Sequence, residues 1–151
     1  MWLAPSLLLC CLAGIALDGD KPSAAEDLQL LQGEWELLFV ECKPERTKGY
    51  YKGLRLTVKG TIMIFSGRND QGGVQQEKAL FRLRPELSPK GIDMPNPYLA
   101  DVPPQYGIYE VTAHILVLYF NSKEGGPRPK DFSLPKEDDH RYIMAVFRRV
   151  K

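Results

Sequence analysis

Leu54-Arg55-Leu56-Thr57-Val58-Lys59-Gly60 is the stretch of sequence that decides the fold class. Its apolar residues stand at every second position, and polar residues fill the positions between them. Because successive side chains of a β-strand point to opposite faces, this period of two predicts a half-buried strand. Gly60 then offers a turn into the next apolar run, at 61–65.

The same alternation recurs along the chain from Trp35 to Val150. Twelve prolines and thirteen glycines divide these 151 residues into brief segments, which favours strands and turns over long helices. We therefore predict an all-β domain: a small antiparallel meander of about eight strands, closed as a barrel or folded as a sandwich. A short helical turn at 27–31 precedes it. The predicted strands are 35–40, 54–59, 61–65, 79–84, 91–94, 106–111, 115–120, 131–134 and 141–150.

The N-terminus has a different composition. Residues 2–17 contain no charged residue, and this apolar stretch is shorter than the about 20 residues of a membrane span. We predict a signal peptide at 1–17, a flexible spacer at 18–26 and a lipocalin-like β-barrel domain at 27–151. Export to the periplasm or the extracellular space follows. No basic residue precedes the apolar run, so an uncleaved anchor or a buried N-terminal segment remains the alternative.

Composition narrows the classes of partner. The formal net charge is +1, from 20 basic and 19 acidic residues, so the charge balance gives no long-range attraction for polyanions and we expect no nucleic acid partner. We expect a monomer that meets the membrane only through its export signal. Cys42 is the one cysteine beyond the predicted signal peptide, so that domain can form no internal disulfide. Cys42 stands next to Lys43 and could be a reactive thiol, but we favour a small apolar filler at a strand end.

No catalytic constellation stands out. His114 falls in a predicted turn. The stretch Glu137-Asp138-Asp139-His140 has metal-binding residue types, but consecutive side chains rarely converge, so a solvated acidic loop is the better interpretation. A carboxylate pair such as Glu110 and Asp131 is explained equally well as surface charge. We therefore predict no catalytic residues, no metal and no cofactor, and a protein that is not an enzyme.

Five segments resemble a known family when taken together. They are 31–35, 56–60, 107–110, 128–133 and 147–151, with the sequences Leu-Gln-Gly-Glu-Trp, Leu-Thr-Val-Lys-Gly, Gly-Ile-Tyr-Glu, Arg-Pro-Lys-Asp-Phe-Ser and Phe-Arg-Arg-Val-Lys. In this order and spacing they are similar to the planctomycete lipocalin-like domain family of unknown function. The resemblance extends from about residue 28 to the C-terminus. It implies an exported lipocalin-like barrel with no established activity, and it carries over no site residue.

Gly33-Glu34-Trp35 also resembles the G-x-W start of true lipocalins. That resemblance implies a tryptophan at the closed end of the barrel, covered by an arginine of the last strand. We expect the partner of Trp35 to be Arg148, because Tyr142, Met144 and Val146 share its parity. The pair would form a structural cation–π contact at the barrel base.

Two functions from different classes fit a barrel of this kind. The first is binding of a small apolar ligand inside it, with Phe39, Leu56, Phe81, Tyr109 and Tyr119 as lining residues by parity; the same residues would otherwise fill a dry core. The second is a protein-interaction module of the cell envelope. It would use the proline-rich loop 95–104 and its aromatic neighbours Tyr98 and Tyr106. The prolines could equally serve only to stiffen a long connection.

Overall fold

The computed structural model describes residues 23–43, 53–68, 71–134 and 141–151, and of Lys43 only the backbone. The predicted signal peptide 1–17 and the acidic loop 137–140 lie outside the described residues. Within the described ranges the chain forms one helix and nine strands, which confirms the all-β class. The elements are α1 (Ala24–Leu31), β1 (Gly33–Lys43), β2 (Arg55–Lys59), β3 (Ile62–Arg68), β4 (Val74–Leu80), β5 (Arg82–Arg84), β6 (Gly91–Met94), β7 (Gln105–Val111), β8 (Ile115–Asn121) and β9 (Tyr142–Arg149).

The strands form a single antiparallel meander that is nearly closed into a barrel. Their order in the sheet is β4-β3-β2-β1-β9-β8-β7-β6-β5, so every pair of neighbours except β1 and β9 is also consecutive in sequence. Pairing of the first strand with the last closes the ring on one side. The ring stays open between β4 and β5, which are the two edge strands.

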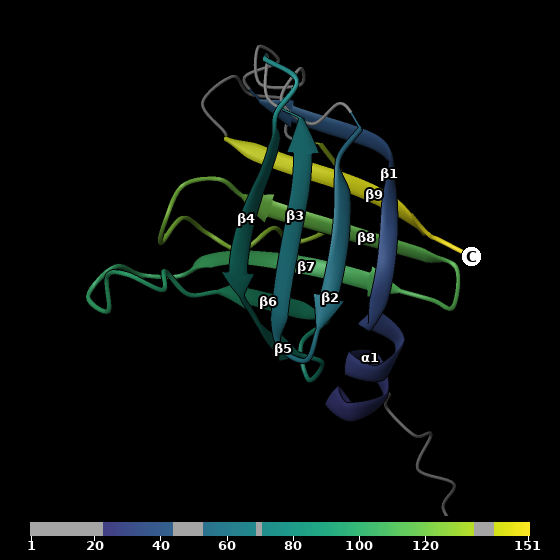
Figure 1. Ribbon diagram of the computed structural model, residues 1–151. Coiled ribbons are helices and arrows are strands. Elements are labelled where there is room, and N and C mark those ends of the chain that lie inside the picture. The colour runs from purple at the N-terminus through teal and green to yellow at the C-terminus, as the bar shows by residue number, and fades with distance from the viewer. Residues whose placement is uncertain (1–22, 44–52, 69–70, 135–140) are drawn as a thin grey trace, which may run out of the picture.

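The barrel is flattened into two layers that cross at a steep angle. Figure 1 shows β2, β3 and β4 upright in front of β6, β7 and β8, which run across behind them. Strand β1 belongs to both layers, since it pairs with β2 at its start and with β9 along most of its length. A β-bulge between Leu37 and Phe39 marks the change, because a bulge bends a strand and lets it turn the corner between two sheets.

The second corner lies at Phe81, between β4 and β5. We predicted one strand at 79–84, but the chain leaves the front layer after Leu80 and enters the rear layer at Arg82. The N–H of Phe81 donates to the Thr61 carbonyl at 3.0 Å, and its side chain is buried in the core. A buried aromatic therefore holds the corner, and the chain needs no glycine there.

The predicted strand at 131–134 is wrong, because these residues form no strand. The Asp131 carboxylate accepts hydrogen bonds from the backbone N–H and the hydroxyl of Ser133. Aspartate and serine side chains that bond to nearby backbone groups compete with sheet pairing in this way. The segment is a loop that lies over the rear layer.

Helix α1 begins earlier than predicted, so the spacer at 18–26 is wrong at its C-terminal end. Ser23 caps the helix by accepting from the Glu26 N–H, and the Glu26 carboxylate accepts in return from the Ser23 N–H. This reciprocal capping box satisfies two backbone donors at the first turn. The helix then turns Asp27 and Leu31 inward, where both are buried.

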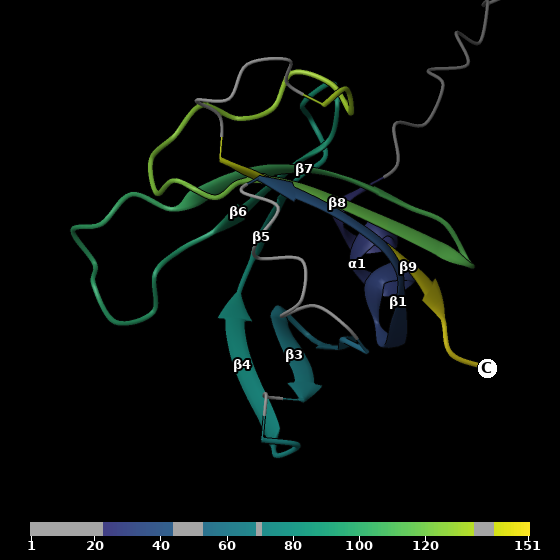
Figure 2. The same ribbon diagram turned by 90° about the horizontal axis from the view of Figure 1, so that it is seen from above.

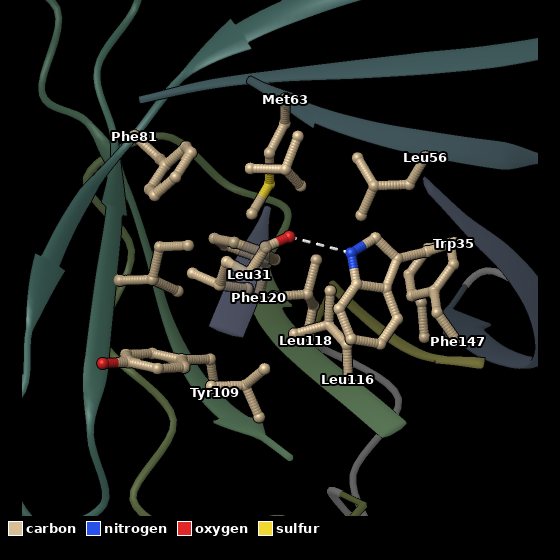
Figure 3. Close-up of a cluster of buried hydrophobic side chains, with 14 residues drawn as sticks. Leu31, Trp35, Leu56, Met63, Phe81, Tyr109, Leu116, Leu118, Phe120 and Phe147 are labelled. Carbon is tan, nitrogen blue, oxygen red and sulfur yellow. Dashed lines mark hydrogen bonds between the residues drawn. The ribbon is translucent and has the colours of Figure 1, made fainter. Parts of the chain in front are cut away.

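The core fills the space between the two layers. Figure 3 shows side chains from α1, β1, β2, β3, β7, β8 and β9, together with Phe81, converging on one cluster. Its buried members are Leu31, Trp35, Leu56, Val58, Met63, Phe81, Ile92, Tyr109, Val111, Leu116, Leu118, Phe120, Ala145 and Phe147. Gly107 belongs to this packing, since a Cβ there would lie 2.5 Å from the ring of Phe120. The absence of a side chain at Gly107 lets that ring pack directly on the β7 backbone.

Candidate functional site

Three of the five predicted lining residues meet inside the barrel. Leu56, Phe81 and Tyr109 are buried members of the core cluster, and Figure 3 shows all three pointing into it. Their contacts are with other side chains of that cluster. In the half of the barrel next to α1 these residues form a packed core, which is the alternative interpretation of the parity pattern.

Phe39 does not line the barrel, and its prediction is wrong. Its side chain is 48% exposed, and that of its neighbour Leu38 is 49% exposed. The reason is the bulge in β1, where Leu38 is the extra residue between Leu37 and Phe39. An extra residue moves every later side chain to the other face of the strand, so the parity counted from Trp35 fails at Phe39.

Tyr119 lies on the outer face of the barrel, so its prediction is also wrong. It belongs to a second buried cluster with Ile108 and Tyr142, packed against Phe132 and Met144. Its hydroxyl donates to the Ser133 carbonyl at 3.1 Å, and burial raises the pKa of Tyr119 to about 12. The rear layer thus packs apolar residues on both faces, one against the core and the other against the loop at 122–134. Parity alone cannot say which face is the interior.

Trp35 and Arg149 seal the base of the barrel. They are opposite each other in the β1–β9 register, and the guanidinium carbon lies 4.1 Å from the indole centroid. The indole Nε1 donates to the Leu31 carbonyl at 2.9 Å. The guanidinium also donates to the carbonyls of Leu30, Gln32 and Ala113. One side chain therefore ties the end of α1 and the β7–β8 turn to the tryptophan.

The predicted partner of Trp35, Arg148, is wrong by one residue. Arg148 lies on the outer face of β9 and forms an ion pair with Glu36, the residue opposite it on β1. The inner face of β9 carries Ala145 and Phe147, both in the core cluster. Tyr142 and Met144 of β9 pack on the outer face against Phe132 of the 122–134 loop, and their parity misled the choice of face.

A buried polar cluster at the base escaped the sequence analysis. The Asp27 carboxylate accepts from Lys90 Nζ at 2.8 and 3.0 Å and from the Tyr109 hydroxyl at 2.7 Å. Burial, and then the hydrogen bond to Asp27, raises the pKa of Tyr109 well above its ordinary value, so this hydroxyl stays protonated and donates. The cluster fixes α1 to β7 and to the residue before β6. No local signal reveals it, because the partners are 63 and 82 residues away in sequence.

The most distinctive surface feature is the loop at 95–104, which presents two apolar side chains on a backbone held by hydrogen bonds. Between β6 and β7, the Asn96 side chain accepts from the backbone N–H groups of Tyr98 and Leu99 at 2.9 and 3.2 Å. This Asx turn places both side chains at the tip of the proline-rich loop 95–104. Tyr98 is 90% exposed and Leu99 is 56% exposed. The loop therefore presents an aromatic and an aliphatic side chain to solvent on a fixed backbone.

Neighbouring segments brace this loop. The Gly125 N–H donates to the Pro104 carbonyl at 3.2 Å, and the Asn96 amide donates to the Glu124 carboxylate at 3.3 Å. Two loops that are far apart in sequence thus support each other. The predicted second aromatic of this surface, Tyr106, is half-buried beneath the Arg128 guanidinium, 5.1 Å from its ring centroid, and belongs to the support.

Arg128 anchors the supporting loop to the rear layer. Its guanidinium donates to the carbonyls of Ile92 and Gly107 and pairs with the buried carboxylate of Asp93. Arg84 binds the other oxygen of the same carboxylate at 3.1 Å. Two arginines balance the charge of the Asp93 carboxylate and donate hydrogen bonds to it. These three residues therefore act as a structural clamp.

A shallow open pocket lies between α1 and the β7–β8 turn. Its volume is about 480 Å³, and Glu26, Gln29, Leu30, Ala113 and Arg149 line it. The guanidinium of Arg149 is already engaged with three carbonyls and the Trp35 ring. The polar groups left for a ligand are the exposed side chains of Glu26 and Gln29, which define no specific chemistry.

Those residues weighed for catalysis or metal binding that the structure describes do not assemble into a site; the stretch 137–140 lies outside the described residues. His114 is exposed in the β7–β8 turn, Glu110 is exposed on β7, and Cys42 is buried on β1. Asp131 is exposed, and its hydrogen bonds from Ser133 lower the pKa of its carboxyl. Among the residues that the structure describes, no three His, Cys, Asp or Glu side chains gather as a metal site would require.

Comparison with known proteins leaves the fold and the surface to carry the functional argument. Neither the protein-family models, nor the curated proteins, nor the solved structures contain a match to this chain. In the described part of the chain, no helix is long and apolar enough to span a membrane.

Proposed function

We propose that this chain is an exported lipocalin-like domain that binds a protein of the cell envelope through its 95–104 loop. The observation that carries the proposal is the 90% exposure of Tyr98 on a braced Asx turn. Tyrosine is enriched among the residues that dominate binding energies, and an exposed aromatic on a preorganised backbone loses little entropy when it docks. The expected partner surface is an apolar pocket with a polar rim.

The buried polar groups support a binding module over an enzyme. The two buried acidic residues of the described part, Asp27 and Asp93, are each paired with lysine or arginine in contacts that join secondary-structure elements. Such pairs hold a fold together. The apolar N-terminus, and five segments that resemble those of the planctomycete lipocalin-like family, support the proposal of export and of membership in that family.

Site-specific photocrosslinking in the producing cell tests the loop directly. A benzophenone amino acid replaces Tyr98 in one variant and Leu38 in a matched control, whose side chain is similarly apolar and lies on β1. We expect a crosslinked envelope protein from position 98 and none from position 38. Equal crosslinking from both positions, or none from position 98, would contradict the proposal.

A second candidate function rests on the half of the barrel away from α1. There the inward side chains Leu37, Leu54 and Phe65 pack against the core but remain only partly buried. An apolar ligand would complete their burial beside Leu56. Native mass spectrometry of the purified protein tests this idea: a co-purified molecule that a Phe65→Ala variant loses supports it, and a mass equal to that of the chain alone rejects it.

A further inference from the structure

Among the described strands, β4 has a neighbour on one side only, so one edge of the sheet has no partner there. It pairs with β3 on one side, from Ile62↔Leu80 to Arg68↔Val74, and it ends the strand order on the other side. Figure 2 shows β4 at the margin of the molecule, with β3 beside it. Six of its seven residues are exposed, and the seventh, Ala79, is half-buried, so no described segment covers either face for most of its length.

The register with β3 shows which backbone groups face solvent. The Phe81 N–H donates to the Thr61 carbonyl, and alternate residues back along the strand, including Gln75 and Glu77, point their backbone groups toward β3 in the same way. The N–H and C=O groups of the residues between them therefore point outward. These residues are Val74, Gln76, Lys78 and Leu80. This is a regular donor–acceptor row, long enough to accept another strand.

Two features that often block such an edge, a proline and a β-bulge, are missing from β4. Its sequence, Val-Gln-Gln-Glu-Lys-Ala-Leu, contains no proline, and its pairing with β3 contains no bulge. Its only charged residues are Glu77 and Lys78, so the strand carries no net charge. A regular edge strand that has no net charge and is exposed along most of its length invites pairing with another extended segment.

Charge decides which register a second copy of β4 can adopt. A two-fold axis perpendicular to the sheet pairs the strands antiparallel and keeps equivalent faces on the same side, so the axis must pass through one residue position. Centring on Glu77 or Lys78 would place like charges directly opposite each other, which is destabilising. Centring on Gln76 is the longest register that avoids this. It sets Gln76 against itself, Gln75 against Glu77 and Val74 against Lys78.

We propose that this chain forms a two-fold dimer in which β4 pairs antiparallel with β4 of a second copy, centred on Gln76. The outward backbone groups of Val74, Gln76 and Lys78 then exchange hydrogen bonds across the axis. Gln75 faces Glu77 of the other copy at a position where side chains are close, so an amide N–H can donate to the carboxylate. The two barrels join through one continuous sheet, which satisfies the edge that each leaves open.

Cysteine crosslinking tests the register. Gln75→Cys and Glu77→Cys variants are made separately, in a background where Cys10 and Cys11 are serine. Because residues 75 and 77 oppose each other, we expect a mixture of the two variants to form disulfide-linked dimers several-fold faster than either variant alone. A Lys59→Cys variant, exposed on β2, serves as the control for random collision. Equal rates in the mixture and in the separate variants would overturn the register.

A proline tests the pairing itself. The N–H of Gln76 points away from β3, so Gln76→Pro removes an edge donor while it leaves the β3–β4 ladder intact. We expect sedimentation to show a dimer for the wild type and for Gln76→Ala, and a monomer for Gln76→Pro with an unchanged circular dichroism spectrum. A wild type that is monomeric at every concentration would overturn the proposal. A wild type that binds only some other protein through β4, and loses it in Gln76→Pro, would also overturn self-pairing.

Discussion

The base of the barrel and the 95–104 loop differ in which of their groups are held in place: side chains at the base and the backbone in the loop. At the base, Trp35 and Asp27 are buried, and each is held by an arginine or lysine and by backbone or hydroxyl groups. In the loop, Tyr98 and Leu99 are exposed, and only the backbone beneath them is fixed. The contacts at the base thus contribute to the stability of the domain, whereas the apolar side chains of the loop stay exposed after folding. This difference predicts that stability and binding respond to separate substitutions.

Trp35→Ala should produce the largest effect on stability. The indole is fully buried, stacks on Arg149 and donates to the Leu31 carbonyl, so its removal leaves a large cavity and an unstacked guanidinium. We expect a loss of about 3–5 kcal/mol in the free energy of unfolding, measured by urea denaturation. Tyr98→Ala is the matched aromatic truncation in the loop. A similar loss in both variants would remove the contrast between the two regions.

Asp27→Asn should produce the second largest loss in the free energy of unfolding. The amide keeps the shape of the side chain but leaves the Lys90 ammonium without its counter-charge and weakens the bond from Tyr109. We expect a loss of about 2–3 kcal/mol, because charge-assisted hydrogen bonds are about twice as strong as neutral ones.

A double-mutant cycle of Asp27→Asn and Lys90→Met measures how much the interaction between the two side chains contributes to the free energy of unfolding. In the double variant neither charge of the Asp27–Lys90 pair remains. We expect the double variant to lose less than the sum of the two single losses. Strict additivity would show that the two side chains stabilise the base independently.

The neighbouring residues Arg148 and Arg149 allow a sharper comparison of contributions to stability. Arg149→Ala removes the stack on Trp35 and three bonds to carbonyls, and we expect a loss of about 2 kcal/mol. Arg148→Ala removes only an exposed ion pair with Glu36, and we expect a change below about 0.5 kcal/mol. Thermal unfolding of the two variants side by side measures the difference. The opposite ranking would return the barrel-base role to Arg148.

Tyr119→Phe should cost less stability than Arg149→Ala, and it should also change the pH dependence. The phenol loses its bond to the Ser133 carbonyl, worth about 1 kcal/mol. The pKa of Tyr119 rises from 10.0 to about 12 on folding, so the protonated form is favoured in the folded state. Its contribution is complete below pH 10 and is lost as the pH rises from 10 toward 12. The free energy of unfolding should therefore fall less steeply over this range in Tyr119→Phe than in the wild type.

Much of the architecture could be predicted from local patterns. Strands such as 54–59 alternate cleanly because one face is buried and the other is solvated, and the turns between strands carry glycine or polar residues. The helix start at Ser23 was also within reach, since Ser23 and Glu26 form a capping-box pattern three residues apart. These features depend on neighbours in sequence, and a single sequence contains that information.

The site residues were harder to predict because long-range packing decides them. Phe39 and Tyr119 were assigned to the interior by parity, but a bulge reverses the first and a covering loop buries the second on the outside. Arg148 was preferred to Arg149 for the same reason. Tyr98 could be singled out from the sequence, because a proline-rich loop that carries an aromatic residue is a local signal; its role in binding stays a prediction. Its 90% exposure is a property of the folded chain.

Retention of an envelope protein by a Tyr98→Ala/Leu99→Ala variant, measured together with its free energy of unfolding, tests the central claim most directly. Neither side chain is buried, so the account predicts a free energy within about 0.5 kcal/mol of the wild type. It also predicts that a partner retained by the wild type and by Leu38→Ala is lost. A variant that is equally stable and still retains the partner would contradict the claim that this loop is the binding surface.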